Sequence, residues 1–400
     1  MMIASLLDND LYKFTMMQAV YHKFSHVDVE YKFICRNKGT NVHFTQKHVD
    51  EIKEQIRLLC ELRFDKSDLE YLRSLRFIKP DFVEFLKLFY FDEKFVFIEF
   101  DEHNNNIEMR IKGPWLYTIL FEVPILAIVN EVYSASQCDN TNIAIKNIFD
   151  KMKFVKNNVD CEQFKFTDFG TRRRFSCNWH RIVIDILLKG LPNSFIGTSN
   201  LHYAKEFGIL PIGTMAHEWL QAHQALYKIE DSQRIAFQNW ANEYRGDLGI
   251  ALTDVIGVRA FLDDFDLYFA KLFDGVRHDS GNPFAFGELI LDHYRKMKIN
   301  PKTKTIVFSD SLNFESAINI FNEFSEFINV SFGIGTNLTN DMGFSPLQSV
   351  IKMVKCNGRD VAKISDEEVK VVCENDEYVR YLKHVYKYMP LVQLPSEVLS

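Results

Sequence analysis

The sequence lacks the features that mark secreted, membrane-spanning and zinc-binding proteins. Its seven cysteines are odd in number and include no CxxC pair, which argues against a disulfide framework and against a zinc site. The N-terminus has no basic segment followed by an apolar one, and no apolar run reaches the roughly eighteen residues that a membrane span requires. Proline-rich linkers and low-complexity segments are missing as well. We therefore expect a protein of the reducing cytoplasm with no membrane partner.

Long runs of positive charge are lacking too. The chain of 400 residues carries a formal net charge of −7, and its most basic run is the short arginine run at 172–174. This charge balance argues against a general nucleic-acid-binding protein. The length suits roughly two or three domains, or one barrel with additions, and it allows a substantial core.

Residues 1–130 mix helical and strand patterns, and we predict that they form an N-terminal α+β domain. Apolar residues recur at helical spacing over 11–24, just after Asp8 and Asp10, either of which could cap the helix. Residues 27–33 alternate between apolar and polar, as in a half-buried strand. The other expected elements are two or three helices within 45–90, a hairpin of 94–100 with 107–112, and an apolar helical region over 115–134.

A second pattern begins near residue 164, where a short apolar strand, a polar or glycine-rich loop and a helix repeat. Such alternation indicates a parallel sheet with crossover helices. The number of repeats favours an irregular, incomplete α/β barrel at least as much as an open doubly wound sheet. We assign residues 131–366 to this barrel and 367–400 to a C-terminal helical tail, with a helix over 376–388, that packs back on the N-terminal domain. The expected strands are 164–169, 194–197, 209–213, 249–252, 274–277, 305–308 and 330–333.

Each predicted strand is followed by polar or glycine residues. In a parallel α/β barrel the carboxyl ends of the strands share one rim, and reactive groups lie there. Any single group could be ordinary turn chemistry, but groups at every strand end indicate a site. The groups are Asp168 to Arg172, Gly197 to Asn200, Gly213 to His217, Thr253-Asp254, Arg277 to Pro283, Ser309 to Ser311 and Gly333 to Thr336.

The residue types at these strand ends suit an anionic, polyhydroxylated ligand. The ends at 309–311 and 333–336 offer backbone N–H groups to a phosphate. The carboxylates of Asp254, Asp279 and Asp310 could hold ribose hydroxyls, Mg²⁺ or the water ligands of Mg²⁺. The rim is therefore expected to bind a phosphorylated sugar.

Two arginines, an aromatic ring and a histidine complete the set. Arg172 and Arg277 can bind a carboxylate or a phosphate through paired hydrogen bonds, and Phe169 offers a flat apolar face. His217 begins a helix, where the dipole favours a neutral imidazole and any nearby anion. This placement suits a phosphate site or an imidazole nucleophile. Taken alone, a histidine beside a turn is more often structural, and Phe169 alone is more often a core residue.

Taken together, the motifs resemble those of nicotinate phosphoribosyltransferases. They occur in the order of that family, and the resemblance covers about residues 8–366. Residues 135–162 and those beyond 366 contain no motif that can be assigned. The matching motifs are DLYK from Asp10, DFGTRR from Asp168, GTSN from Gly197, GTMAHEW from Gly213, RHDSGNP from Arg277 and FGIGTN from Phe332.

The resemblance implies an ATP-dependent enzyme of NAD salvage. The family makes nicotinate mononucleotide and diphosphate from nicotinate and 5-phosphoribosyl 1-diphosphate, with ATP hydrolysis coupled to synthesis and Mg²⁺ on the diphosphate. Its fold is an irregular α/β barrel of the type II phosphoribosyltransferase kind with an N-terminal α/β domain. Its active sites are shared between the subunits of a homodimer.

The resemblance also implies the catalytic roles. His217 is the residue that ATP phosphorylates, and its phosphorylation favours binding and turnover of the diphosphate sugar. Asp279 would hold ribose hydroxyls, Asp254 would act near the diphosphate and Mg²⁺, and Arg277 would position the ring or a phosphate.

Substrate-binding roles follow in the same way. The pyridine ring would stack between Phe169 and Tyr12 of the partner subunit, while Arg172 attracts the nicotinate carboxylate. The remaining residues expected to bind substrate are Thr198 and Ser199 near the pyridine, Asp310, Gly333, Gly335 and Thr336 at the 5-phosphate, and Arg36 and Lys38 at the diphosphate.

Substrate choice is expected to depend on Ser199. Nicotinamide-using relatives carry an aspartate there, whose carboxylate accepts a hydrogen bond from the amide and repels nicotinate. With a serine here, and with Arg172 and Arg174 nearby in sequence, we expect the acid as substrate. The rival interpretations are a nicotinamide-using enzyme, a non-catalytic nucleotide-binding homologue and a purely structural barrel. Intact His217, Asp254, Arg277 and Asp279 argue against the non-catalytic homologue, and the joint set of motifs argues against a purely structural barrel.

Overall fold

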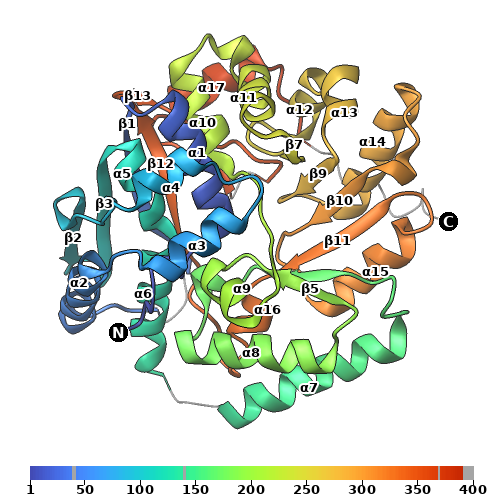
Figure 1. The fold of residues 1–400 in the computed structure, drawn as a ribbon. Coiled ribbons are helices and arrows are strands. Elements are labelled where there is room, and N and C mark those ends of the chain that lie inside the picture. The colour runs from blue at the N-terminus through green and yellow to red at the C-terminus, as the bar shows by residue number, and fades with distance from the viewer. Residues whose placement is uncertain (38–41, 138–140, 368–369, 391–400) are drawn as a thin grey trace. The chain divides into compact units, whose positions relative to one another are not determined.

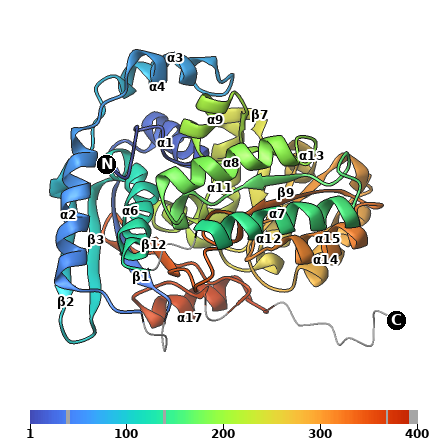
Figure 2. The same cartoon turned by 90° about the horizontal axis from the view of Figure 1, so that it is seen from below.

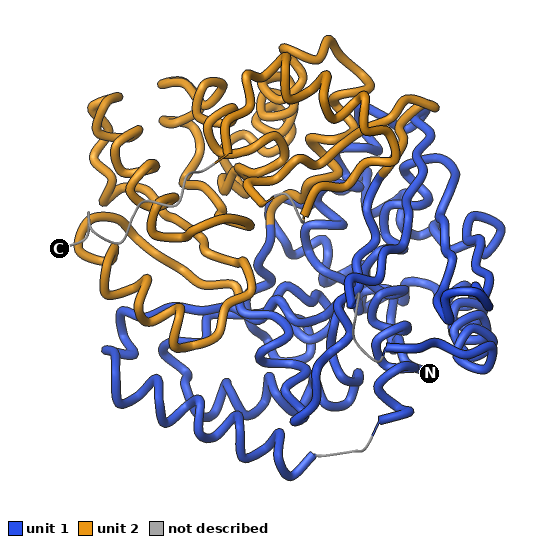
Figure 3. The backbone as a smooth tube through the Cα atoms, turned by 180° about the vertical axis from the view of Figure 1, so that it is seen from behind, with its two compact units in different colours: residues 1–213, 334–353 blue, residues 214–333, 354–400 orange. Residues whose placement is uncertain are grey.

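The computed structural model describes residues 1–37, 42–137, 141–367 and 370–390, so Lys38 lies outside the described residues. The chain forms two compact units (Figure 3). Unit 1 holds residues 1–213 and 334–353, and unit 2 holds residues 214–333 and 354–400. The division into domains 1–130, 131–366 and 367–400 remains a prediction from the helix and strand patterns of the sequence.

Unit 1 begins with the elements predicted for the N-terminal part (Figure 1). Strand β1 buries Val29, Tyr31 and Phe33, as its alternation predicts, and it pairs antiparallel with β3, which also pairs antiparallel with β2. Helix α2 lies alongside β2 (Figure 2). The bounds are α1 (Leu11–Lys23), β1 (Asp28–Cys35), α2 (Gln46–Glu61), α3 (Lys66–Ser74), α4 (Pro80–Leu86), β2 (Val96–Asp101) and β3 (Asn106–Pro114).

The start of α1 differs from its prediction. Asp10 occupies the N-cap position, but its side chain makes no capping hydrogen bond. Its carboxylate instead accepts a hydrogen bond from Ser199 Oγ at 2.8 Å. Asp8 pairs with the guanidinium of Arg174. The expectation of a side-chain cap is wrong, because the carboxylates of Asp8 and Asp10 bind residues that are distant in the sequence.

The predicted apolar helical region over 115–134 is confirmed, and it extends to Ala135. Residues 115–135 form one helical stretch, built from α5 (Trp115–Thr118), a 3₁₀ turn at Ile119–Phe121 and α6 (Glu122–Ala135). By length and composition this stretch could cross a membrane, which corrects the expectation that no segment reaches that length. However, 89% of its most apolar window is buried inside the protein, as in a core helix of a globular fold.

Three short parallel strands also belong to unit 1, namely β4 (Phe166–Asp168), β5 (Phe195–Thr198) and β6 (Leu210–Pro211). Helices α7 (Thr141–Asn158) and α8 (Cys177–Gly190) lie side by side in both views (Figures 1 and 2), and α9 (Leu201–Phe207) follows β5. A Cβ atom on Gly170, just after β4, would lie 2.2 Å from the side chain of Thr339. The turn after β4 therefore requires glycine.

Unit 2 carries the other parallel strands. Strand β9 pairs with β8 and β10, and β10 pairs with β11. These strands are β8 (Ile250–Leu252), β9 (Gly275–His278), β10 (Thr305–Phe308) and β11 (Asn329–Ile334), which ends at the unit boundary. The main helices are α10 (His217–Leu226), α11 (Ile229–Tyr244), α12 (Val258–Asp264), α13 (Leu267–Leu272), α14 (Pro283–Lys296) and α15 (Phe314–Phe324).

The predicted class is confirmed: the fold is α/β, with a parallel half-barrel sheet and an antiparallel N-terminal sheet. Each strand predicted from residue 164 onward is present. Strands β7 (Arg245–Leu248), β12 (Ser349–Cys356) and β13 (Arg359–Asp360) were not predicted.

The C-terminal part returns to the rest of the chain in two places. In unit 1, the backbone N–H of Arg36 donates to the carbonyl of Gln348 at 2.7 Å. In unit 2, α17 (Asp376–Val385) confirms the predicted tail helix, and Tyr386 just after it donates to the Ile229 carbonyl at the start of α11. The described tail helix thus packs within unit 2.

Candidate active site

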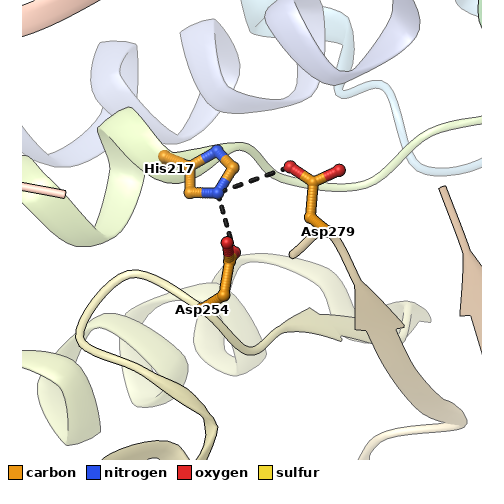
Figure 4. Close-up of side chains that lie close together, drawn as sticks. All are labelled: His217, Asp254 and Asp279. Carbon is orange, nitrogen blue, oxygen red and sulfur yellow. Dashed lines mark hydrogen bonds and ion pairs between the residues drawn. The ribbon is translucent and has the colours of Figure 1, made fainter. Parts of the chain in front are cut away.

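A histidine and two carboxylates meet in unit 2 (Figure 4). His217 is the first residue of α10, Asp254 follows β8 and Asp279 follows β9. His217 Nε2 lies 2.8 Å from Asp254 Oδ1 and 3.5 Å from Asp279 Oδ2. His217 and Asp254 are buried, whereas the side chain of Asp279 is 26% exposed. Three of the four predicted catalytic side chains therefore lie together.

The carboxylate of Asp254 is ionised and is surrounded by several hydrogen-bond donors. Its Oδ2 accepts hydrogen bonds from Ser280 Oγ at 2.7 Å and Ser365 Oγ at 3.4 Å, and lies 2.9 Å from Lys363 Nζ. Burial alone would raise the pKa of Asp254, but Lys363 and then His217 hold it well below its usual value. Since a carboxylate only accepts, the neutral His217 ring carries its proton on Nε2 and its lone pair on Nδ1.

Asp279 is also held ionised. Burial alone would raise its pKa, but Arg277, followed by His217 and Lys363, lowers it to about 2. Its Oδ1 accepts a hydrogen bond from Ser309 Oγ at 3.0 Å. Arg277 Nε is buried and has no hydrogen-bond partner among the described residues. A buried guanidinium donor beside an ionised carboxylate suits a ligand phosphate.

The histidine and the two carboxylates could also approach a metal ion, because one donor atom of each lies within 4.8 Å of the others. Asp254 fits Mg²⁺ poorly, since one oxygen accepts from His217 and the other faces the ammonium of Lys363. Asp279 fits better because its carboxylate is more exposed. Of the two carboxylates, Asp279 is therefore the one more open to a ligand.

Asp310, after β10, has a protein partner of its own. Its Oδ2 lies 2.7 Å from Lys370 Nζ, which also lies 2.9 Å from Glu367 Oε1. Burial raises the pKa of Asp310 despite the lowering effect of Lys370. Gly333 is buried in the neighbouring strand β11. Asp310 and Gly333 thus lie at adjacent strands of unit 2, and their assignment to a phosphate stays a prediction.

The carboxyl group of Asp366 predicts a pH dependence of stability. Its oxygens accept from the N–H of Val258, each at 3.1 Å, while burial and then Asp254 raise its pKa to about 7. Because the pKa of Asp366 is higher in the folded protein than in the unfolded chain, its protonated carboxyl stabilises the fold. This contribution is complete below the pKa of the unfolded chain and is lost as the pH rises through about 7. We expect Asp366→Asn to be increasingly more stable than wild type from pH 5 to pH 8, by on the order of 4 kcal/mol at most.

Thermal unfolding of both proteins across this pH range measures the effect. A difference in melting temperature between Asp366→Asn and wild type that does not change with pH would contradict the prediction.

The predicted pyridine-binding residues lie in unit 1, around the ends of β4 and β5, and Asp168 connects them. Its Oδ2 accepts from Thr198 Oγ1 at 2.6 Å and lies 2.7 Å from His180 Nε2, while its Oδ1 accepts from the N–H of Gly170 at 2.8 Å. Burial alone would raise the pKa of Asp168, but His180 and then Thr198 lower it. Asp168 therefore connects the turn that contains Phe169 to Thr198 at the end of β5.

The hydroxyls of Thr198 and Ser199 both donate to buried carboxylates. The Thr198 hydroxyl donates to Asp168 and accepts from the N–H of Asn200 at 3.1 Å, so protein partners hold it in place. Ser199 Oγ donates to Asp10, whose pKa is raised by burial against the lowering effect of Arg172. Substitutions at Ser199 will therefore act on Asp10 as well as on a ligand.

The two arginines expected near the nicotinate carboxylate differ. Arg174 is fully buried, and its Nη1 and Nη2 bind the two oxygens of Asp8 at 2.7 and 2.8 Å. Arg174 therefore gives no support to the expectation of an acidic substrate, because Asp8 pairs with its charge. The side chain of Arg172 is 36% exposed, and its Nη1 donates to Glu122 Oε1 at 3.1 Å. Glu122 also lies 2.6 Å from Lys13 Nζ.

The remaining predicted binding residues of unit 1 have these positions. Tyr12 is half-buried on α1, and Arg36 follows β1. Gly335 precedes the short helix α16 (Thr336–Thr339), which begins with Thr336. A Cβ atom on Gly335 would lie 3.0 Å from the carbonyl oxygen of Phe169, so the approach of these two loops favours glycine. The roles of these residues in binding stay predictions.

The fold and the residues at its strand ends define an α/β enzyme in which a buried histidine contacts an ionised carboxylate. Comparison with known proteins gives the family. The nicotinate phosphoribosyltransferase (NAPRTase) family profile matches residues 164–389, and the profile of the N-terminal domain of the same family matches residues 7–130. The chain belongs to the nicotinate phosphoribosyltransferase family.

Individual relatives agree with this assignment. The chain is 51% identical over 393 residues to nicotinate phosphoribosyltransferase of Bordetella pertussis, covering 98% of this chain and 96% of that protein. It is 50% identical over 387 residues to the enzyme of Xylella fastidiosa, covering 96% and 98%. The crystal structure of nicotinate phosphoribosyltransferase from Vibrio cholerae superimposes with a TM-score of 0.92 at 37% identity, covering 100% of this chain and 96% of that chain.

Sequence reasoning missed several residues of these clusters. His180 lies on the buried face of α8 among apolar side chains, so its position could have flagged a histidine that needs a partner. The sequence around Lys363 and Glu122 does not identify their partners, because these lie far away along the chain.

Proposed function

We propose that the protein forms nicotinate mononucleotide and diphosphate from nicotinate and 5-phosphoribosyl 1-diphosphate, with ATP as co-substrate and Mg²⁺ as cofactor. The proposal rests on the contact between His217 Nε2 and the ionised carboxylate of Asp254, found in a chain of this family. A reducing, cytoplasmic location suits the described cysteines, which are free thiols.

In the first half-reaction, His217 attacks the γ-phosphorus of ATP. Because Asp254 fixes the proton on Nε2, the attacking atom is Nδ1. The Nδ1–P bond forms as the bond to the β–γ bridging oxygen breaks, and ADP leaves. The phosphorylated ring is cationic, so Asp254 and Asp279 stabilise its charge. Mg²⁺, when bound, would neutralise charge on the phosphates, with Asp279 as the nearest suitable carboxylate.

In the second half-reaction, the pyridine nitrogen attacks the anomeric carbon as diphosphate leaves. No strong base is required because that nitrogen already has a lone pair. Positive charge develops on the sugar, so catalysis depends on positioning and electrostatics. Asp279 is assigned to the ribose hydroxyls and Arg277 to a phosphate. Assigned to the 5-phosphate are Asp310, Gly333, Gly335 and Thr336, and assigned to the diphosphate are Arg36 and Lys38.

The pyridine ring is assigned to Phe169, with Tyr12 of the partner subunit on its other face in a homodimer. The partly exposed guanidinium of Arg172 is assigned to the nicotinate carboxylate. Coupling to ATP requires that the phosphorylated and free forms of His217 differ in their affinity for substrate or product.

The test is product formation by the purified protein with nicotinate, the diphosphate sugar and Mg²⁺, with and without ATP. Nicotinate mononucleotide and ADP are followed together. We expect matched formation of both, greatly enhanced by ATP. No product from nicotinate, followed by product from nicotinamide, would favour the amide-using alternative. No product from either substrate would favour a binding protein.

Ser199→Asp should shift preference from nicotinate toward nicotinamide. The new carboxylate can accept from an amide but repels the acid, and it also lies beside Asp10. We expect the ratio of kcat/KM for nicotinate to that for nicotinamide to fall by roughly tenfold or more.

Ser199→Asn, which is similar in size and neutral, is the matched control and should change this ratio less. An unchanged ratio in Ser199→Asp would show that this residue does not set the choice.

A further inference from the structure

Residues 363–367, here called the 363–367 segment, contact two of the loops at the catalytic rim of unit 2. The N–H of Ile364 donates to the Val255 carbonyl at 2.7 Å, next to Asp254. The N–H of Gly281 donates to Glu367 Oε1 at 2.8 Å. The segment therefore connects the loop after β8 to the loop after β9, although no sequence motif marks it.

The lysine at the start of this segment has a specific partner. Lys363 Nζ lies 2.9 Å from Asp254 Oδ2, and the two side chains are only 6% and 1% exposed. The opposite oxygen of Asp254 accepts from His217 Nε2 (Figure 4). The carboxylate of Asp254 thus lies between the buried ammonium of Lys363 and the imidazole of His217.

We propose that Lys363 is a positioning residue for the reaction: its ammonium holds the Asp254 carboxylate in place, and through Asp254 it fixes the orientation of the His217 ring. This inference rests on the proposed function and deepens it. The physical reason is that a buried carboxylate without a cation would bind a proton, and a protonated Asp254 could no longer accept from Nε2.

Other charged groups also act on the Asp254–His217 pair, so the effect of Lys363 must be separated from theirs. From the β9 loop these are Asp279, Arg277 and His278, and from the 363–367 segment Asp366. Lys363 differs from them because it is the ammonium in direct contact with Asp254. The ammonium of Lys363 disfavours a second positive charge on His217 and stabilises the ionised form of Asp254. Its loss therefore favours protonation of both members of the pair.

Unit 2 offers a matched control in Lys304. Its Nζ is buried and donates to the backbone carbonyls of Phe273 at 2.6 Å and Lys271 at 3.2 Å. These acceptors are backbone oxygens, whereas the acceptor of Lys363 is the carboxylate that holds His217. A purely structural role for Lys363 predicts that its neutral variants behave like Lys304→Met.

The experiment compares full-length wild type, Lys363→Gln, Lys363→Met, Lys363→Arg and Lys304→Met. It measures acid-labile phosphohistidine formed from ATP across pH 5–9, thermal unfolding, and the protonation midpoint of His217 by NMR of ring-labelled histidine. We expect His217 to be phosphorylated about tenfold more slowly in Lys363→Gln and Lys363→Met. The acid limb of the pH–rate profile and the protonation midpoint of His217 should both lie about one pH unit higher than in wild type. Lys363→Arg should recover most of the rate, because it keeps the charge.

The outcomes separate the two claims. If the Lys363→Gln or Lys363→Met profile and the His217 midpoint match those of Lys304→Met, the assignment of Lys363 is overturned. If wild type forms no nicotinate mononucleotide, the proposed function fails, and the midpoint still decides whether Lys363 controls the pair. If one neutral variant does not fold, the other supplies the same comparison.

Discussion

His217→Ala should abolish the dependence of product formation on ATP while leaving slow, ATP-independent transfer. The imidazole is the proposed phosphoryl acceptor, held by Asp254 with its lone pair on Nδ1, and alanine supplies no nucleophile. The groups assigned to sugar and pyridine remain in place. We expect the ATP-stimulated rate to fall on the order of a hundredfold or more. ADP release and nicotinate mononucleotide formation, measured together, test this.

His223 gives a control on the same helix. It is buried, its Nδ1 lies 2.7 Å from the carbonyl of Trp219, and the amide of Asn239 lies 3.1 Å from its Nε2. His223→Ala should lower stability but keep ADP and product matched. Stoichiometric ATP hydrolysis by His217→Ala would mean that another residue accepts the phosphoryl group.

The strands and the rim could be predicted because their signals are local. Alternation over 27–33 and the repeated strand-loop-helix pattern depend on neighbours a few residues away, and β10 was predicted with its observed bounds. His217, Asp254 and Asp279 converge because strand ends of a parallel sheet share one edge.

Side-chain partnerships over long range could not be predicted in this way. Asp10 looked like a helix cap, yet its carboxylate accepts from Ser199, 189 positions away. Arg174 was counted with Arg172 as a reason to expect an acidic substrate, yet its guanidinium pairs with Asp8. In each case a buried charge requires a partner, and only the fold determines which one it finds.

Arg174→Met should be among the most destabilising single changes in unit 1. It leaves the carboxylate of Asp8 buried without its counter-charge, because both side chains are 0% exposed. Burial alone would raise the pKa of Asp8, and Arg174 is the main cause that lowers it. Removing one partner of such a pair typically costs about 3–5 kcal/mol. The thermal unfolding midpoint at neutral pH measures the loss.

The exposed pair of Arg181 and Glu206 gives the comparison. Their side chains are 51% and 30% exposed, so Arg181→Met should cost no more than about 1 kcal/mol. The double variant Asp8→Leu/Arg174→Met removes both charges and should recover part of the stability that Arg174→Met loses. Since Asp8 also accepts from Asn200 Nδ2 at 2.8 Å, beside Ser199, Arg174→Met should weaken nicotinate binding as well. Equal losses in Arg174→Met and Arg181→Met would mean that the buried pair contributes no more than a surface one.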